Sequence, residues 1–231
     1  VKDTPLKAAL ALKEKYKKKI DLQIGFQTLF GILDKKERRI YEKNLEHADY
    51  ISGLPSADRP NFNKSLNVFC DLAKQTGKSL ALHIDQEFNP KEKDSLKFAK
   101  AVIKKGLFNK TTIIHGVSIA AQTPKTRKEI YKHLKAGQIS IVVCPGAALS
   151  MKMLNQKAYL SNSIAPVREL IENGINVGLG TDNIHDFFMP LAQGDMWFEL
   201  KMLAEACRYY DISKLAEIAS KNGLKILNSN N

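Results

Sequence analysis

Short apolar runs alternate along this chain with longer segments in which apolar residues recur every three or four positions. The short runs are rich in Val, Ile and Leu, so they predict buried strands, whereas the longer segments predict amphipathic helices. The predicted strands are residues 20–26, 48–54, 79–83, 111–115, 139–143 and 175–179. The predicted helices are residues 6–18, 35–46, 63–75, 91–105, 126–135, 165–172, 194–209 and 212–220.

Glycine stands between several of these helices and the strands that follow them. Gly77, Gly106, Gly137 and Gly174 each suit the position just after a helix, where a left-handed backbone is common. The chain therefore repeats a strand–helix unit, and this repeat predicts a parallel sheet covered by helices.

Two parallel α/β folds fit this repeat, and the segment after the first predicted strand favours one of them. A doubly wound sheet usually carries a glycine-rich phosphate-binding turn there, but Gln27-Thr-Leu-Phe-Gly31 is no such turn. A TIM (β/α)8 barrel has eight strands in about 250 residues. We therefore predict an α/β barrel that lacks its first two strands, with residues 1–231 forming a single domain that covers strands 3 to 8.

Composition narrows the class of protein. The 231 residues are 44% hydrophobic and 26% charged, which is ordinary for a globular domain. No apolar stretch is long enough to span a bilayer, and the chain begins at Val1 with no signal-peptide pattern, so we expect some sequence to be missing upstream. Three widely spaced cysteines without a Cys-x-x-Cys pair indicate a reducing, cytoplasmic environment.

The chain carries a net charge of +12, from 36 Lys and Arg against 24 Asp and Glu. An acidic partner is one interpretation of this charge. The lysines, however, fall on predicted helix faces, as in Lys13-Glu-Lys-Tyr-Lys-Lys-Lys19, and no stripe of alternating basic and aromatic residues is present. We therefore expect neither a nucleic acid nor a membrane as a partner.

Three predicted strands end in, or just before, a residue that can bind a metal or move a proton. These residues are His83, His115 and Asp182. Parallel α/β folds place their active sites at the carboxyl ends of strands, so the three side chains are expected to share one edge of the sheet. Each residue also has a simpler interpretation, because a lone histidine is often structural and Asp182 could cap a helix.

The order of these motifs resembles the metal-dependent amidohydrolase superfamily, and within it the cytosine deaminase branch. The resemblance covers nearly the whole chain, and its most specific parts follow the fifth and eighth barrel strands. The segments resembling strands three to eight are Ile20-Asp-Leu-Gln-Ile-Gly-Phe26, Ala48-Asp-Tyr-Ile-Ser-Gly-Leu-Pro55, Leu82-His-Ile-Asp-Gln-Glu87, Ile114-His-Gly-Val-Ser118, Val142-Val-Cys-Pro-Gly146 and Gly178-Leu-Gly-Thr-Asp-Asn-Ile-His-Asp186.

The resemblance implies roles for these residues. His83 and Asp182 would be ligands of a divalent metal, zinc or iron, and Asp182 would also act as the general base toward water. His115 would stabilise charge on the reacting oxygen. The implied reaction is hydrolysis of a C–N bond in a small cyclic or heterocyclic substrate.

Two departures from the family pattern affect the catalytic residues. The family's His-x-His ligand pair on strand one is absent, and two ligands are too few for a catalytic metal, which needs at least three. Gln86 stands where the family has its catalytic Glu, and an amide cannot shuttle a proton. We expect the adjacent Glu87 to take this role, although a solvent-facing Glu near a helix start is an equal alternative.

The predicted substrate-binding residues also depart from the family. Gln27 lies closer to the end of its predicted strand than the family's substrate-binding Gln does. Asn183 stands where the family has a second Asp, directly after the metal-binding Asp. Phe188 corresponds to an aromatic residue that covers the substrate, although a core position beside Phe187 is the alternative. Gln86 is the fourth predicted substrate-binding residue. These changes argue against cytosine itself as the substrate.

The sequence thus predicts a cytosine-deaminase-like hydrolase with a small-molecule substrate. The alternative is a catalytically impaired homologue that binds a small ligand without turnover. Without barrel strands one and two, residues 20–26 and 175–179 would be open sheet edges, so we also expect either an upstream segment or association into a homo-oligomer.

Overall fold

The computed structural model describes residues 4–28, 30–150 and 164–228, and it forms two compact units, residues 1–82 and 83–231. Each unit is described by itself. The boundary falls within strand β2 (Ser79–Ile84), so the last two residues of that strand, His83 and Ile84, belong to the second unit.

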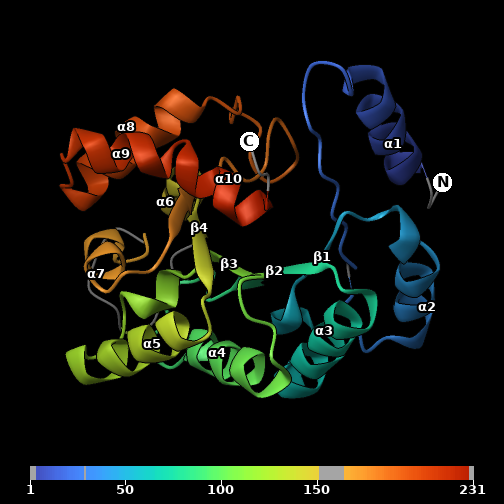
Figure 1. Ribbon diagram of the computed structural model, residues 1–231, viewed down its shortest axis with the longest axis horizontal. Coiled ribbons are helices and arrows are strands. Elements are labelled where there is room, and N and C mark those ends of the chain that lie inside the picture. The colour runs from blue at the N-terminus through green and yellow to red at the C-terminus, as the bar shows by residue number, and fades with distance from the viewer. Residues whose placement is uncertain (1–3, 29, 151–163, 229–231) are drawn as a thin grey trace. The chain divides into compact units, whose positions relative to one another are not determined.

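The first unit packs helices against a pair of parallel strands, drawn in blue and teal in Figure 1. Strand β1 (Tyr50–Gly53) pairs with β2, with Tyr50 opposite Ser79 and Gly53 opposite Leu82. Gly53 lets the ring of Phe69 approach, since a Cβ there would lie 2.2 Å from that ring. The helices of this unit are α1 (Thr4–Tyr16), α2 (Lys35–Lys43) and α3 (Phe62–Thr76), with short 3-10 turns η1 (Leu45–His47) and η2 (Pro55–Asp58).

The strand predicted over residues 20–26 is not present, so that part of the prediction is wrong. Asp49 N donates to Ile24 O at 2.8 Å, as a strand ladder would require. Ile24 N, however, donates to the Asp49 carboxylate at 2.7 Å rather than to a backbone carbonyl. Lys13 pairs with the same carboxylate at 2.5 Å. A side chain therefore takes the place of the next ladder hydrogen bond, and the other five predicted strands form.

In its described residues, the second unit contains the end of β2, three further strands and seven helices, α4 to α10. Strand β3 (Thr111–His115) pairs in parallel with β4 (Ser140–Val143), and β4 pairs in parallel with β5 (Val177–Leu179). Helices α4 (Asp94–Lys105) and α5 (Pro124–Ala136) pack against each other (Figure 1). The remaining elements are η3 (Val117–Ile119), α6 (Pro145–Ser150), α7 (Val167–Glu172), α8 (Met196–Cys207), α9 (Ile212–Ile218) and α10 (Lys221–Leu227).

The predicted helix-ending glycines behave as expected in three of four cases. Gly77, Gly106 and Gly174 have φ values of 71°, 71° and 75°, which is the left-handed region. Gly137 instead has φ −81°, and the next residue, Gln138, takes the left-handed conformation at φ 53°. The helix α5 thus continues one residue further than the glycine suggests, and a non-glycine residue makes the turn.

Within the described ranges, no helix combines the length and the apolar character that crossing a membrane requires.

Candidate functional site

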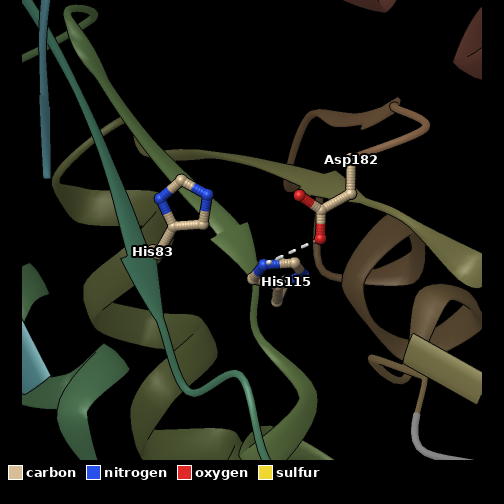
Figure 2. A group of neighbouring side chains, drawn as sticks. All are labelled: His83, His115 and Asp182. Atoms are coloured by element: carbon tan, nitrogen blue, oxygen red, sulfur yellow. Dashed lines mark ion pairs between the residues drawn. The ribbon is translucent and has the colours of Figure 1, made fainter. Parts of the chain in front are cut away.

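Two histidines and one aspartate of the second unit converge at the ends of its strands. His83 is the penultimate residue of β2, and His115 is the last residue of β3. Asp182 lies three residues after Leu179, the last residue of β5. One ligand atom from each of the three side chains lies within 4.8 Å of the others (Figure 2).

The two imidazole rings and the carboxylate face a common point. The ring centroids of His83 and His115 are 5.3 Å apart, with a tilt of 47° between the ring planes. His115 Nε2 lies 3.7 Å from Asp182 Oδ2, the pair joined by the dashed line in Figure 2. That distance is longer than a hydrogen bond. His115 and Asp182 therefore do not bond to each other, and both side chains are close enough to bind one shared ligand.

Two of these three residues have a strained backbone. His115 has φ 81° and Asp182 has φ 60°. Both values lie in the left-handed region that residues other than glycine rarely adopt. Such a conformation costs about 1–3 kcal/mol and persists where the surrounding structure enforces it, which is common at functional sites. Gly116 supports the turn after His115, because its N–H donates to Ile84 O at 3.0 Å.

Burial keeps the His115 imidazole neutral. The residue is 2% exposed, and burial, helped by the nearby His83, lowers its pKa to about 3. Its contact with Asp182 is therefore not an ion pair at neutral pH. Within the described residues, neither ring nitrogen of His115 has a hydrogen-bond partner. Burial also raises the pKa of Asp182, while His83 opposes this shift.

Buried imidazole nitrogens without a partner are costly, and a metal ion would satisfy them. Two imidazoles and a carboxylate form a donor set that suits zinc or iron. The residues present therefore fit a divalent metal, and His115 could act as a third ligand beside the two expected from the sequence.

The other predicted site residues lie around this group or in the first unit. The Glu87 side chain is exposed, and Gln86 is half-buried in the same loop after β2. The Asn183 amide donates to the Asp186 carboxylate. Phe188 is 80% exposed, so it is not a core residue, and its ring meets Phe187 edge-on.

Gln27, the remaining predicted substrate-binding residue, belongs to the first unit and is exposed. Its role, like the roles of Gln86, Glu87, Asn183 and Phe188, stays a prediction.

Sequence reasoning missed Asp85, which organises the loop behind the site. Its buried carboxylate accepts from Asp94 N at 3.2 Å, from Ser95 N at 3.0 Å and from the Ser95 hydroxyl. Its carbonyl accepts from Val117 N at 2.7 Å, which ties the end of β2 to the turn after β3. The sequence carries little signal for this, because the donors lie nine and ten residues away.

Sequence reasoning also missed Glu199 on α8. This residue is 5% exposed, and its Oε2 accepts from Gly146 N at 2.7 Å. Glu199 lies four residues before the fully buried Leu203, so the two share a helix face. A charged residue on an apolar helix face was the signal in the sequence.

The fold and this donor set define a class of protein, and comparison with known families agrees with it. The model of the amidohydrolase family matches residues 1–231. The chain therefore belongs to the amidohydrolase family.

Individual relatives share the fold at low sequence identity. A crystal structure of 5-methylcytosine deaminase from Klebsiella pneumoniae, liganded with phosphonocytosine, superposes with a TM-score of 0.91 at 24% identity, over 98% of this chain and 57% of that one. A crystal structure of an adenosine deaminase from Xanthomonas campestris with bound zinc has a TM-score of 0.64 at 18% identity, over 95% of this chain and 51% of that one.

A curated relative is similar in sequence over most of the chain. The N-isopropylammelide isopropyl amidohydrolase of Pseudomonas sp. (strain ADP) is 26% identical over 198 residues, which are 84% of this chain and 46% of the relative. The chain thus spans about half the length of these relatives. The barrel architecture expected from the strand–helix repeat is confirmed, and the described residues contribute five parallel strands to it.

Proposed function

We propose that this chain carries the greater part of the active site of a metal-dependent hydrolase, which cleaves a C–N bond of a small cyclic or heterocyclic molecule. The observation that carries the proposal is the convergence of His83, His115 and Asp182 at the ends of β2, β3 and β5. The names of the relatives support it, since one is a 5-methylcytosine deaminase and another an N-isopropylammelide amidohydrolase. The three free thiols fit a cytoplasmic protein.

In this proposal His83, His115 and Asp182 would hold a divalent metal, zinc or iron. When bound, the metal would lower the pKa of water from about 15.7 toward about 7 and so provide a nucleophile at neutral pH. Asp182 would accept the proton of the attacking water and return it to the leaving nitrogen. Its carboxylate lies near both imidazoles, which supports this role.

The second candidate function is a homologue that binds a small ligand without turnover. Two observations favour it: Gln86 lacks an ionisable group, and the neighbouring Glu87 is exposed rather than directed into a buried site. The second proton-transferring group, which the family's Glu supplies at position 86, is then missing beside Asp182. The pocket and its ligand would remain, without catalysis.

Metal binding tests the proposal first. The chain is stripped with a chelator and titrated with Co2+, whose visible absorption reports imidazole and carboxylate ligation. We expect one ion per chain, and a loss of affinity of about 100-fold or more in His83→Ala or Asp182→Asn. The control is His185→Ala, since that exposed histidine contacts Pro190 O at 3.1 Å. Equal affinity in all four proteins would overturn the proposed metal centre.

Turnover then separates the two candidates. The metal-loaded protein is incubated with a panel of aminopyrimidines and aminotriazines, and released ammonia or amine is measured. Release that is abolished by Asp182→Asn supports the hydrolase. Saturable binding of a panel member, with no release from any of them, supports the impaired homologue.

A further inference from the structure

Helices α4 and α5 of the second unit carry a concentration of positive charge. The two helices pack against each other (Figure 1). Together they contain nine Lys and Arg residues but only two acidic residues, Asp94 and Glu129. A large part of the chain's net charge of +12 is therefore gathered on one pair of helices. Such a surface attracts anions.

A hollow of about 350 Å³ lies between these two helices. Its walls combine apolar side chains with basic ones, and among the described residues no acidic side chain lines it. The lining residues are Lys100, Ile103, Lys104, Lys132, His133 and Ala136. The lysine stems can lie along the apolar surface while their ammonium groups stay in water. The hollow thus offers an apolar floor with positive charge around it.

The three lysines of the hollow are available to an anion. Lys100 lies 3.2 Å from the Glu129 carboxylate, but both side chains of this pair are about half exposed. Exposed pairs of this kind contribute little free energy, so a ligand can displace the carboxylate. Within the described ranges, neither Lys104 nor Lys132 forms an ion pair.

Stabilisation of the helix ends does not account for all of these charges. A basic residue in the last turn of a helix offsets the partial negative charge there. Lys105 of α4 and Lys135 of α5 occupy such positions. Lys100 and Lys132 lie before the last turns of their helices. Their presence beside the hollow therefore needs another explanation.

The hollow is separate from the candidate metal centre. Its lining residues fall in the second halves of α4 and α5, and the strands β3 and β4 begin a few residues after these helices end. The hollow therefore lies toward the edge of the sheet where the strands begin. His83 and His115 lie at the other ends of their strands.

The dimensions of the hollow suit a small molecule. The lining residues span positions 100–104 of α4 and 132–136 of α5. Five residues of α-helix extend over about 6 Å, which is too short for an extended peptide or a nucleic-acid strand to lie along. The volume of the hollow is within the range of small-molecule sites.

We propose that the hollow between α4 and α5 binds a small phosphate ester. The phosphate group would lie among Lys100, Lys104 and Lys132, and the organic part would lie against Ile103 and Ala136. Phosphate suits lysine, because the ammonium group is a compact point charge that can approach phosphate oxygens from several directions. Binding at this site requires neither the metal nor turnover of the proposed hydrolase.

Phenyl phosphate and phenyl sulfate test the proposal on the chelator-treated 231-residue chain at pH 8 and low ionic strength. They have nearly the same shape, but the phosphate is doubly charged at this pH and the sulfate singly charged. Amide chemical-shift titrations give the dissociation constants and show which residues respond. We expect phenyl phosphate to bind about threefold or more tightly than phenyl sulfate, with the largest shifts in the second halves of α4 and α5. Inorganic phosphate, which lacks the apolar part, should bind about threefold more weakly than phenyl phosphate.

Substitution of single lysines distinguishes a site from diffuse attraction. Lys104→Gln and Lys132→Gln should each weaken phenyl phosphate binding by about three- to fivefold. The matched control is Lys125→Gln, which removes the same charge from an exposed position in the first turn of α5. The control should change the dissociation constant by less than about twofold, because its ammonium group is screened from the hollow.

Four results would overturn the proposal. The first is an absence of saturable binding by the unaltered protein. The second is an equal weakening by Lys125→Gln, which would show attraction by the net charge alone. The third is a pattern in which the largest shifts surround His83 and His115. The fourth is tighter binding of a polyglutamate peptide or a thymidine oligonucleotide to the same lysines, which would assign the surface to a macromolecular partner.

Discussion

At the scale of single residues, the candidate site is built from strained or buried polar groups that neighbouring donors hold in place. His115 and Asp182 both have left-handed backbones, and so does Asp85 at φ 55°. The Asp85 carboxylate accepts hydrogen bonds from backbone and hydroxyl donors. Both ring nitrogens of His115, by contrast, have no hydrogen-bond partner among the described residues. The first arrangement supports the loop, and the second is available to a ligand.

Asp85→Ala should destabilise the protein strongly. The substitution leaves Asp94 N, Ser95 N and the Ser95 hydroxyl buried without their acceptor. We expect the free energy of unfolding to fall by about 2–4 kcal/mol, measured by urea titration. Ser95→Ala, which removes one of these donors, should cost about 1 kcal/mol. An effect of Asp85→Ala no larger than that of Ser95→Ala would show that the carboxylate has no such structural role.

Glu87 carries the catalytic prediction at this scale. If the protein is an active hydrolase and Glu87 moves the proton that Gln86 cannot, Glu87→Gln should lower kcat by about 10²–10⁴-fold with an unchanged melting curve. Gln86→Ala should cost far less. Steady-state turnover under metal-loaded conditions provides the measurement, and undiminished kcat in Glu87→Gln would assign the proton transfer to another group.

At the scale of elements, α5 and α7 are joined by an ion pair on their facing sides. Arg127 donates to both Glu169 oxygens, at 2.8 and 2.9 Å, and the Tyr131 hydroxyl donates to Glu169 Oε2 at 2.8 Å. Arg127 chiefly lowers the pKa of Glu169 below its ordinary value of 4.5. A bidentate pair of this kind fixes the angle between two helices as well as their distance.

This pair should make stability depend on pH in the acid range. Because the folded pKa of Glu169 is depressed, its contribution is complete above the unfolded pKa and is lost as pH falls below about 4.5 toward the folded value. Glu169→Gln should reduce stability at pH 7 by about 0.5–1 kcal/mol, a small effect because the side chain is 39% exposed. Unfolding titrations at pH 7 and in acid, with exposed Glu172→Gln as the control, should show a smaller acid loss in the Glu169 variant alone.

The end of α5 allows a stabilising change. Gln138 is exposed and has φ 53°, a conformation that glycine adopts without a Cβ penalty. Gln138→Gly should raise the free energy of unfolding by about 0.5–1 kcal/mol. A thermal melt measures this, and a lower melting temperature would show that the side chain makes contacts that outweigh the backbone strain.

At the scale of the whole molecule, the second unit leaves large apolar side chains in solvent. Phe187 is 93% exposed, Leu191 is 88% exposed and Trp197 is 72% exposed. Exposed apolar groups of this size usually mark a surface that another chain or segment covers. The chain also spans about half the length of its relatives. A surface that the rest of such a relative covers therefore need not be covered in this chain.

We therefore expect the isolated chain to self-associate. Light scattering over a concentration series should give a mass that rises above that of one 25.9 kDa chain. Leu191→Asp should reduce the association, because it places a charge at an 88% exposed apolar position. The net charge of +12 opposes association at low ionic strength, so added salt should strengthen it. A monodisperse monomer at all concentrations and salt levels would contradict this expectation.

Much of the fold could be predicted from local pattern. The alternation of apolar and polar positions located β1 to β5 and the helices between them except α6, because these periodicities depend on near neighbours in the chain. The same pattern placed His83 and His115 at the ends of their strands and Asp182 just beyond one. The pattern failed for residues 20–26, whose composition is typical of a strand. There the Ile24 N–H donates to the Asp49 carboxylate and not to a neighbouring strand.

Tertiary structure decided the rest, because it depends on residues that are distant in sequence. Which atoms converge follows from how β2, β3 and β5 are placed, and this brought His115 within reach of Asp182, 67 positions along the chain, as a third donor. Glu199 accepts the N–H of Gly146, 53 residues away, and this contact exists only once α6 and α8 are packed together. The sequence by itself determined the elements and the residues at their ends, and the packing alone determined the distances, the burial and the charge states on which function depends.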